Sequence, residues 1–495
     1  MVLRHPTSSD WNPIMNSLAR LVLHFSFAIA LLLSSAWSSR AVAADAKTAR
    51  PPNVIFIMTD DLGYGDLGAY GQKKIRTPHI DALAAQGMKF TQYYAGSAVC
   101  APSRCVLLTG LHSGHAFVRD NYEVGKFEKG APEGQMPLPA ETTTIGTLFK
   151  QQGYTTSCIG KWGLGGPGST GEPNRQGFDH FFGYLSQRVA HNLYPTHLWR
   201  NRDKVVLEGN EYGNLVGKHY SHDLMTDEAL AFVKQNKDKP FFLYLAWHIP
   251  HLALQVPEDS MAEYHKAFGE EKPYDGKKGY LPHKTPRAAL AGMITRLDRD
   301  TGRLMALIKE LNLDENTIVF FTSDNGGTWD LGGVDPVFFA NNGILRGYKG
   351  SMYEGGLRVP MIVRWPGHIK AGSVSDHQAA HWDVLPTLME LIGTAEATPK
   401  AIDGISFAPT LLAREGQKQH EHLYWELGRR QGIRKGDWKA VRLNPGQPIQ
   451  LFNLKDDVSE TKDVASEHPQ IVAQMRELLK TSRTDSKDFP VLNGK

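Results

Sequence analysis

The chain has 495 residues, of which 41% are hydrophobic and 22% charged, and no apolar run reaches the roughly eighteen residues that a membrane-spanning helix needs. This composition excludes a disordered, fibrous or multispan membrane protein, and a formal net charge of only +3 gives no support to nucleic-acid binding. The 48 glycines exceed the usual share of about 7% and favour a loop-rich α/β enzyme, while three cysteines cannot form a disulfide framework.

The N-terminal segment has the three regions of a secretory signal peptide in their usual order. An apolar run from Leu21 to Leu33 follows Arg20 and precedes the small residues Ala-Val-Ala at 41–43. The run is too short for an ordinary membrane span, and a buried N-terminal helix or an uncleaved anchor is the alternative. We therefore predict that residues 1–43 are a signal peptide and that the protein is exported, either to a periplasm or out of the cell.

Four apolar, β-rich runs each end in polar residues. They span residues 54–58, 155–159, 241–246 and 318–321. Helical patterns separate them: Thr77-Pro78 is typical of a helix start before residues 79–86, and an apolar stripe runs along residues 294–311. This alternation predicts an α/β fold with a mostly parallel sheet flanked by helices. Ligands bind at the carboxyl ends of such strands, so the polar residues after the four runs are expected to share one cleft.

The later part of the chain has other patterns. Residues 257–286, rich in charge, glycine and proline, are predicted to be a surface insertion near the cleft. Beyond about residue 400, residues 432–441 and 449–453 have the pattern of short antiparallel strands, and residues 471–479 that of an amphipathic helix. We therefore predict two regions after the signal peptide. They are a catalytic domain over residues 44–399 and a smaller α+β subdomain with an antiparallel sheet over residues 400–495.

The most informative motif is Cys-Ala-Pro-Ser-Arg at residues 100–104, followed by Leu-Thr-Gly at residues 108–110. Pro102 suits the first turn of a helix, so Cys100 is expected at a helix N-terminus, where the helix dipole and the free amide groups favour an anion. Arg104 adds a fixed positive charge. A capped helix with a buried cysteine is the simpler interpretation of an isolated Cys-x-Pro sequence.

With its continuation, the motif resembles the signature of the type I sulfatases, in which this cysteine is oxidised to formylglycine before the chain folds. Leu111 departs from the basic residue that the family often has after Thr-Gly. The resemblance continues in family order through residues 53–66, 77–81, 160–162, 250–251, 322–326, 349–360 and 436–439. It implies an alkaline-phosphatase-like fold, sulfate-ester hydrolysis, and a formylglycine-generating or anaerobic maturation enzyme that modifies Cys100.

Two of the strand ends carry hard oxygen ligands. Asp60, Asp61, Asp324 and the amide oxygen of Asn325 form a set suited to one Ca²⁺ per chain, and less suited to Mg²⁺ because all the ligands come from the protein. An Asp after a strand is often only a turn residue or a helix cap, which is the alternative for each of them. Because two strand ends with such ligands are expected beside a modified cysteine, we favour a metal site over turn residues or helix caps.

The resemblance also implies catalytic roles. The sulfate would be held by Ca²⁺ together with Lys161, Lys349 and His251. Arg104 would orient the nucleophile. One hydroxyl of the hydrated aldehyde at position 100 would attack sulfur, and His251 or Lys349 would protonate the leaving alcohol. Deprotonation of the second hydroxyl would then release sulfate.

One expected base is absent from the sequence. In many family members a His stands two residues after the Lys of the Gly-Lys-Trp motif, whereas this chain has Gly163. Release of sulfate needs a base with a pKa near the working pH, a role that suits His. We predict His191 as this base, ahead of His197, His112 and His115. Recognition of a sugar hydroxyl is the alternative role for His191.

A glycine- and proline-rich loop over residues 163–177 precedes a cluster of aromatic and basic residues. The predicted substrate-binding residues of this cluster are Arg188, His191, Tyr194 and His197, with Trp199 beside them. An aromatic cluster packed under a loop is the alternative. The segment is similar to bacterial carbohydrate sulfatases that act on galactose or N-acetylgalactosamine sulfates, which implies exo action on a sulfated carbohydrate, with an aryl sulfate as a further substrate.

Two other classes of protein stay open from the sequence. A phosphodiesterase or phosphonate hydrolase of the same superfamily would share the formylglycine and the metal, and an inactive glycan-binding relative would keep the fold. The complete set of predicted catalytic residues speaks against the inactive relative. The other two cysteines, Cys105 and Cys158, are predicted to be buried structural thiols.

Overall fold

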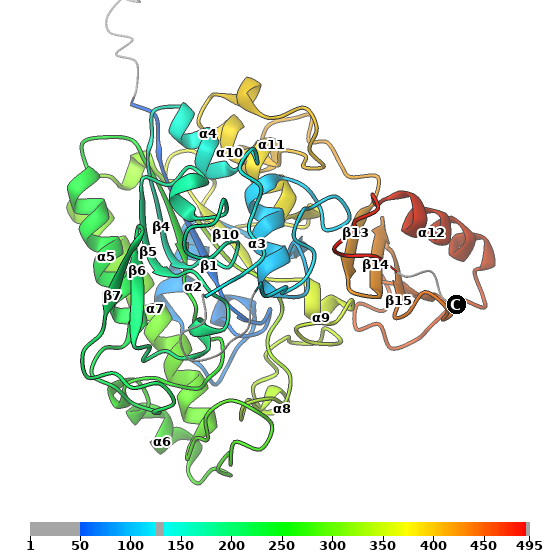
Figure 1. Cartoon of the computed structure of the whole chain (residues 1–495). Helices are drawn as coiled ribbons and strands as arrows, with labels where there is room; N and C mark the ends of the chain where they lie inside the picture. Colours follow the sequence, from blue (N-terminus) through cyan, green and yellow to red (C-terminus); the bar gives the residue numbers. More distant parts are fainter. Residues whose placement is uncertain (1–49, 125–132, 492–495) are drawn as a thin grey trace, which may run out of the picture. The chain divides into compact units, whose positions relative to one another are not determined.

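The computed structural model describes residues 50–124 and 133–491 (Figure 1). The predicted signal peptide, residues 1–43, lies outside these ranges. From Pro51 onward the chain forms one compact unit. Within the described ranges, no helix combines the length and the apolar character needed to cross a membrane.

A ten-stranded sheet forms the centre of this unit, in the order β11-β2-β10-β9-β1-β8-β4-β5-β6-β7. Its five parallel middle strands are β9 (Thr317–Ser323), β1 (Asn53–Thr59), β8 (Phe241–Ala246), β4 (Thr155–Lys161) and β5 (His180–Tyr184). The outer strands are β11 (Ser373–Ser375), β2 (Met88–Phe90), β10 (Met361–Arg364), β6 (His197–Arg200) and β7 (Asp203–Val206). Of these, β10 and β6 run antiparallel to their neighbours. The mostly parallel α/β sheet predicted from the sequence is confirmed.

The four predicted runs all form strands, and they lie side by side as β9, β1, β8 and β4. Thr59 of β1 pairs with Ser323 of β9, and Ala246 of β8 lies opposite both Met58 of β1 and Gly160 of β4. The strands therefore end at one edge of the sheet. This confirms that residues from four distant parts of the sequence come together there.

Alternate residues of β1 face two separate cores. Val54, Phe56 and Met58 belong to one core, and Ile55 and Ile57 to the other. The first core is covered by α3 (Cys100–Thr109), α4 (Ile145–Gln151), α10 (Val384–Leu391) and α11 (Ala408–Leu411). The second is covered by α2 (Pro78–Gln86), α5 (Ser221–Asn236), α6 (Ala262–Phe268) and α7 (Pro286–Glu310) (Figure 1). Because helices cover both faces, polar groups gather at the strand ends.

A separate antiparallel sheet lies near the C-terminus. Its strands follow one another in sequence as β13 (Leu423–Leu427), β14 (Arg430–Lys435), β15 (Trp438–Arg442) and β16 (Gln450–Asn453). Met475 and Leu479 of α12 (Pro469–Thr481) share a small core with this sheet. The remaining elements are the short helices α8 (Pro336–Phe339) and α9 (Glu354–Leu357) and the strand pair β3 (Tyr93–Tyr94) and β12 (Ala379–Ala380). The predicted antiparallel sheet and closing helix are confirmed, and the domain boundary after residue 399 stays a prediction.

Residues 432–441, predicted to form short antiparallel strands, form most of the hairpin of β14 and β15. The chain reverses at Gly436, which adopts a left-handed φ of +58°. Strand β13 was not predicted, because its five residues are all buried and it lacks the alternation of a half-exposed strand. The insertion over residues 257–286 contains the helix α6.

Candidate active site

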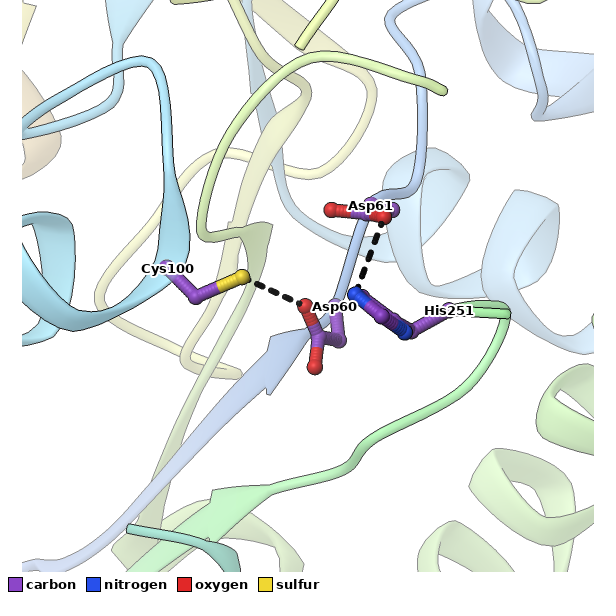
Figure 2. A group of neighbouring side chains, drawn as sticks. All are labelled: Asp60, Asp61, Cys100 and His251. Carbon is purple, nitrogen blue, oxygen red and sulfur yellow. Dashed lines mark hydrogen bonds and ion pairs between the residues drawn. The ribbon is translucent and has the colours of Figure 1, made fainter. Parts of the chain in front are cut away.

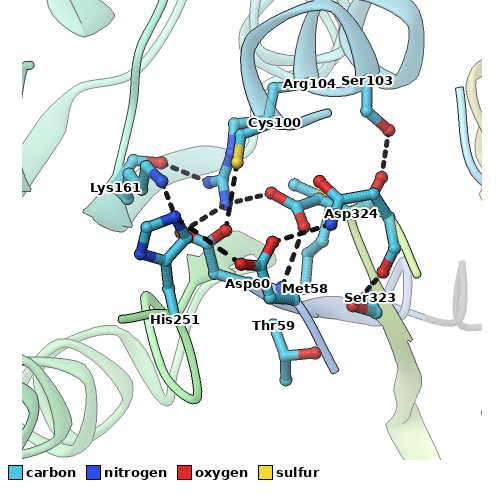
Figure 3. Close-up of polar contacts among 12 residues, drawn as sticks. Met58, Thr59, Asp60, Cys100, Ser103, Arg104, Lys161, His251, Ser323 and Asp324 are labelled. Carbon is cyan, nitrogen blue, oxygen red and sulfur yellow. Dashed lines mark hydrogen bonds and ion pairs between the residues drawn. The ribbon is translucent and has the colours of Figure 1, made fainter. Parts of the chain in front are cut away.

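The predicted catalytic and metal-binding residues gather at the carboxyl edge of the central sheet. They are Asp60 and Asp61 after β1, Cys100 at the start of α3, Lys161 at the end of β4, His251 after β8, and Asp324 after β9 (Figures 2 and 3). Asn325 follows Asp324 in the chain. Lys349 reaches the same place from the loop before α9 and lies 2.8 Å from Asp61. Most of these residues therefore stand at or just after the end of a strand or at the start of a helix, and Lys349 joins them from a loop.

Cys100 is the first residue of α3, and Val99 before it provides no side-chain cap. Its thiol is buried and donates to Asp60 Oδ1 at 3.3 Å (Figure 2). Burial, and after it the negative charge of Asp60, raises the pKa of this thiol well above its usual range. Reactive cysteines have a lowered pKa, because the thiolate is the nucleophile. The unmodified Cys100 is therefore not arranged to act as a thiolate.

Two cations hold the first carboxylate of the site. Lys161 Nζ lies 2.6 Å from Asp60 Oδ2, and Arg104 Nη2 lies 3.6 Å from the same oxygen and 2.7 Å from Asp324 Oδ2 (Figure 3). Burial alone would raise the pKa of Asp60. The positive charges of Lys161, Arg104 and Lys349 outweigh burial and hold that pKa well below its usual range. Asp60 is therefore an ionised carboxylate beside Cys100.

Asp61 is fixed from several sides. Asn325 Nδ2 donates to its Oδ1 at 2.7 Å, and Thr328 Oγ1 donates to its Oδ2 at 2.8 Å. His251 Nε2 lies 3.6 Å from Oδ2. Asp61 itself has a left-handed φ of 65°, a conformation that non-glycine residues adopt mainly where the surroundings enforce it. Thr328 was missed by the sequence analysis, which followed the polar residues only as far as Gly326.

The donor set fits a hard divalent cation. Ligand atoms of Asp60, Asp61, Cys100 and His251 lie within 4.8 Å of one another, so this buried cluster could bind a metal (Figure 2). The cluster shares Asp60 and Asp61 with the predicted ligand set, but it has Cys100 and His251 in place of Asp324 and Asn325. The amide oxygen of Asn325 is buried without a hydrogen-bond partner, which is unfavourable unless a cation or water takes its lone pair. Burial and the charge of Asp60 raise the pKa of Asp324 to about 7. A bound cation would relieve this crowding of negative charge.

His251 belongs to a stack of rings next to the carboxylates. Its Nδ1 donates to the carbonyl oxygen of Leu252 at 2.6 Å, so Nε2 is the nitrogen that faces Asp61. The His191 ring stacks on it with centroids 4.8 Å apart. Tyr280 packs against both rings at 5.3 and 6.2 Å. Burial, followed by the charges of nearby lysines and histidines, lowers the pKa of both His251 and His191, so both rings are neutral.

A pocket of about 300 Å³ opens beside these rings. Of the four predicted substrate-binding residues, Arg188 and His191 line it, together with Tyr280. Tyr194 and His197 do not line it. Tyr194 is buried against Tyr220, and His197 pairs with Glu133. The alternative of an aromatic cluster packed under a loop fits these two residues. Tyr280 lies in the 257–286 insertion, where no local sequence signal distinguished it from a surface tyrosine.

The structure explains why residue 163 is a glycine. Gly163 has a left-handed φ of 77°, and a Cβ on it would lie 1.9 Å from the amide nitrogen of Gln187. Gln187 is buried, and neither polar atom of its side chain has a hydrogen-bond partner among the described residues. Gln187 thus fills the space into which a side chain at position 163 would extend. An amide is not a base, so this replacement leaves the base to another residue.

Cys105 and Cys158 are buried free thiols, as predicted, and burial raises the pKa of both. Cys158 lies in the middle of β4 among large apolar side chains. We expect Cys158→Ala to lower the free energy of unfolding by about 1 kcal/mol, because the smaller side chain leaves a cavity. Urea unfolding measures this change. Turnover per folded molecule should be unchanged, and its loss would contradict a purely structural role.

The fold and the site together define a class of enzyme. Carboxylates, three cations and a buried helix-terminal cysteine meet at the carboxyl edge of a parallel sheet, where cations can neutralise a tetrahedral anion and carboxylates can hold a metal. This is the arrangement of a hydrolase that acts on anionic esters.

Comparison with known proteins identifies the family. A family model described as Sulfatase matches residues 52–394, and a model described as N-sulphoglucosamine sulphohydrolase, C-terminal, matches residues 347–485. The chain therefore belongs to the sulfatase family, and it is a sulfuric ester hydrolase.

Relatives resemble nearly the whole chain. It is 30% identical over 518 residues to an N-acetylgalactosamine-6-O-sulfatase of Bacteroides thetaiotaomicron, covering 88% of this chain and 94% of that protein. It is 32% identical over 497 residues to arylsulfatase A of Homo sapiens, covering 88% and 89% respectively. The crystal structure of Ps i-CgsB in complex with k-i-k-neocarrahexaose superimposes with a TM-score of 0.73 and 30% identity, covering 89% of this chain and 94% of that chain.

Proposed function

We propose that this protein removes sulfate from carbohydrates, using a formylglycine made from Cys100 and one Ca²⁺ per chain. The single observation that carries this proposal is that Cys100, its neighbour Asp60 and the cation Lys161 share one buried centre at the strand ends. Relatives named as carbohydrate sulfatases support the substrate class. The exo mode and the galactose or N-acetylgalactosamine sulfate substrate are part of the same proposal.

The proposed modification accounts for the environment of Cys100. Its Sγ stands where the oxygens of a hydrated aldehyde would be, 3.3 Å from Asp60 Oδ1. Formylglycine would supply two hydroxyl groups on one carbon, one to attack sulfur and one whose deprotonation releases sulfate. A formylglycine-generating or anaerobic maturation enzyme is the implied partner. It would act before the chain folds, because Cys100 is only 1% exposed.

The Ca²⁺ would be held by Asp60, Asp61, Asp324 and Asn325. It would supply positive charge next to the nucleophile and the sulfate oxygens. The unpartnered amide oxygen of Asn325 supports its place in this set.

Residues of the chain would do the remaining work. Lys161 and Lys349, held at Asp60 and Asp61, would neutralise the charge of the sulfate. Arg104 holds Asp324 at 2.7 Å, and its guanidinium stays charged, so it cannot transfer a proton in the reaction. It would therefore act as a positioning residue. Lys349 and His251 stay the two candidates for protonating the leaving alcohol, and His251 would first have to take up a proton on Nε2, because its Nδ1–H is donated to Leu252.

The reaction class is tested by comparing substrates on one preparation. The enzyme should hydrolyse 4-nitrophenyl sulfate and release sulfate from galactose or N-acetylgalactosamine sulfates. A phosphate diester should be hydrolysed far more slowly, and a phosphodiesterase or phosphonate hydrolase would reverse this order. Absence of all three activities in fully modified protein would indicate an inactive glycan-binding relative.

The proposed base is tested at His191. We expect His191→Ala to lower steady-state turnover of an aryl sulfate by about 10²- to 10⁴-fold while the first burst of phenol remains, because sulfate release needs the base and attack does not. Rapid-mixing kinetics separates the two phases. His197→Ala is the matched control, since His197 pairs with Glu133 and does not line the pocket. If both phases survive in His191→Ala, the residue serves substrate recognition or packing instead.

Export and the division into two domains complete the proposal. The N-terminal pattern at residues 1–43 supports export to a periplasm or out of the cell, with removal of this segment. N-terminal sequencing of the mature protein tests the cleavage site.

A further inference from the structure

A second pocket, of about 560 Å³, lies next to the loop that carries Lys349. We call it the Trp329 pocket. Its lining includes Trp329, Arg346, Tyr348, Arg430 and Leu443. Apart from Lys349, none of its lining residues has a role in the reaction described above. The pocket therefore needs an explanation of its own.

The pocket contains two arginines that form no ion pair within 4.0 Å among the described residues, although Arg430 interacts electrostatically with Asp120, and Arg346 with Asp457 and Glu460. Arg346 is exposed, donates to the carbonyl oxygen of Glu460 and lies 4.0 Å over the ring of Tyr353. Arg430 is exposed and donates to the carbonyl oxygen of Gly350 at 2.6 Å. Neither forms an ion pair with any carboxylate of residues 50–124 or 133–491. Each guanidinium still has N–H groups that can bind an anion.

The Trp329 pocket is joined to the reaction centre by short contacts. Gly350, the acceptor of Arg430, donates its own backbone N–H to the carbonyl oxygen of Ala98 at 2.7 Å. Ala98 lies two residues before Cys100. On the other side of Gly350, Lys349 reaches Asp61 at 2.8 Å. The loop of Lys349 and Gly350 therefore lines the pocket and also contacts the reaction centre, through Asp61 and Ala98.

An aromatic surface completes the pocket. Trp329 is 41% exposed, which is unusual for an indole in a chain whose other large aromatic residues are mostly buried. Its exposed ring offers a flat apolar surface of the kind on which a sugar ring packs. An exposed indole in a pocket with two guanidiniums that keep free N–H groups combines apolar contact with recognition of a planar or tetrahedral anion.

We propose that the Trp329 pocket is a subsite for a sugar next to the one that loses sulfate, and that Arg430 and Arg346 bind a second anionic group on that sugar. This inference rests on the proposed carbohydrate substrate. The anionic group is a carboxylate or another sulfate, since both present oxygens to a guanidinium in the same way. The preferred substrate class is then an oligosaccharide with at least two anionic groups.

The test measures binding to the Cys100→Ala protein by calorimetry, so that no probe is consumed. The probes are N-acetylgalactosamine 6-sulfate, a disaccharide that adds a uronate to it, and a disaccharide that adds a second sulfated sugar. We expect both disaccharides to bind at least tenfold more tightly than the monosaccharide, and Arg430→Ala to remove about tenfold of affinity from the disaccharides only. A difference between the two disaccharides identifies the anionic group.

Two further variants make the test specific. Trp329→Ala should lower the affinity for both disaccharides and leave the affinity for the monosaccharide within twofold of the parent value. Arg429→Ala is the matched control, because Arg429 is the exposed neighbour of Arg430 and does not line the pocket. In protein with Cys100 intact, Arg430→Ala and Trp329→Ala should hydrolyse 4-nitrophenyl sulfate at the unchanged rate. A higher salt concentration should weaken binding of the disaccharides more than binding of the monosaccharide.

The failures of the two proposals are distinguishable. Equal affinity for monosaccharide and disaccharides, or an equal loss for all probes in Arg430→Ala, overturns the subsite while desulfation of sugars continues. An enzyme that hydrolyses 4-nitrophenyl sulfate but neither binds nor desulfates any sugar sulfate overturns the carbohydrate proposal, and the subsite with it.

Discussion

Replacement of Cys100 by Ala is expected to abolish turnover of every sulfate ester, by at least about 10⁴-fold, while the protein still folds. The side chain at this position would form the covalent bond to sulfur, and it lies beside Asp60, which Lys161 holds. Alanine is smaller than cysteine and leaves the start of α3 intact. Steady-state assays on 4-nitrophenyl sulfate measure the loss, and circular dichroism checks the fold.

The same expectation has a chemical readout. Peptide mass spectrometry of active enzyme should find the peptide that contains residue 100 with formylglycine in place of cysteine. Cys100→Ser is the informative companion variant, because a serine has one hydroxyl and cannot expel sulfate from its own ester. We expect it to release about one equivalent of phenol and then stop. Only unmodified cysteine in fully active protein would refute the proposed mechanism, and Cys105→Ala should remain active as the control.

The sequence predicted the parts of the site that depend on local patterns. Each of the four apolar runs became a strand, and parallel strands that end at one edge necessarily bring residues such as Asp60 and Asp324 together. The position of Cys100 at a helix start followed from Pro102 in the first turn. These predictions needed only the preferences of single elements and the geometry of parallel sheets.

The sequence did not predict contacts between loops. Gln187 fills the space beside Gly163, and Tyr280 packs on His191, yet neither residue has a local pattern that marks it. Thr328 reaches Asp61 from the loop that follows β9. Arg430 meets Gly350 across a separation of 80 residues. Such contacts depend on how insertions and the C-terminal sheet pack, which the periodicity of a single segment does not encode.

The metal site gives the second large effect. We expect Asp61→Asn to lower Ca²⁺ affinity at least tenfold and turnover at low calcium about 100-fold. The change removes one negative charge from a site whose affinity depends on charge count, and it also removes the partner of Lys349. Elemental analysis of dialysed protein should find about one Ca²⁺ per parent chain and much less in the variant. Added CaCl₂ should restore part of the activity.

A nearby carboxyl provides the matched control for this experiment. Asp66 is buried five residues further along, and it accepts from the backbone N–H of Gly63 at 2.8 Å. Burial raises the pKa of Asp66 to about 8, so it is mainly protonated at neutral pH and Asp66→Asn changes little charge. That variant should keep its Ca²⁺ and its activity. If activity in the parent survives exhaustive chelation with no metal detected, the assignment of Asp60, Asp61, Asp324 and Asn325 is wrong, and Lys161 and Lys349 must neutralise the sulfate without help from a metal ion.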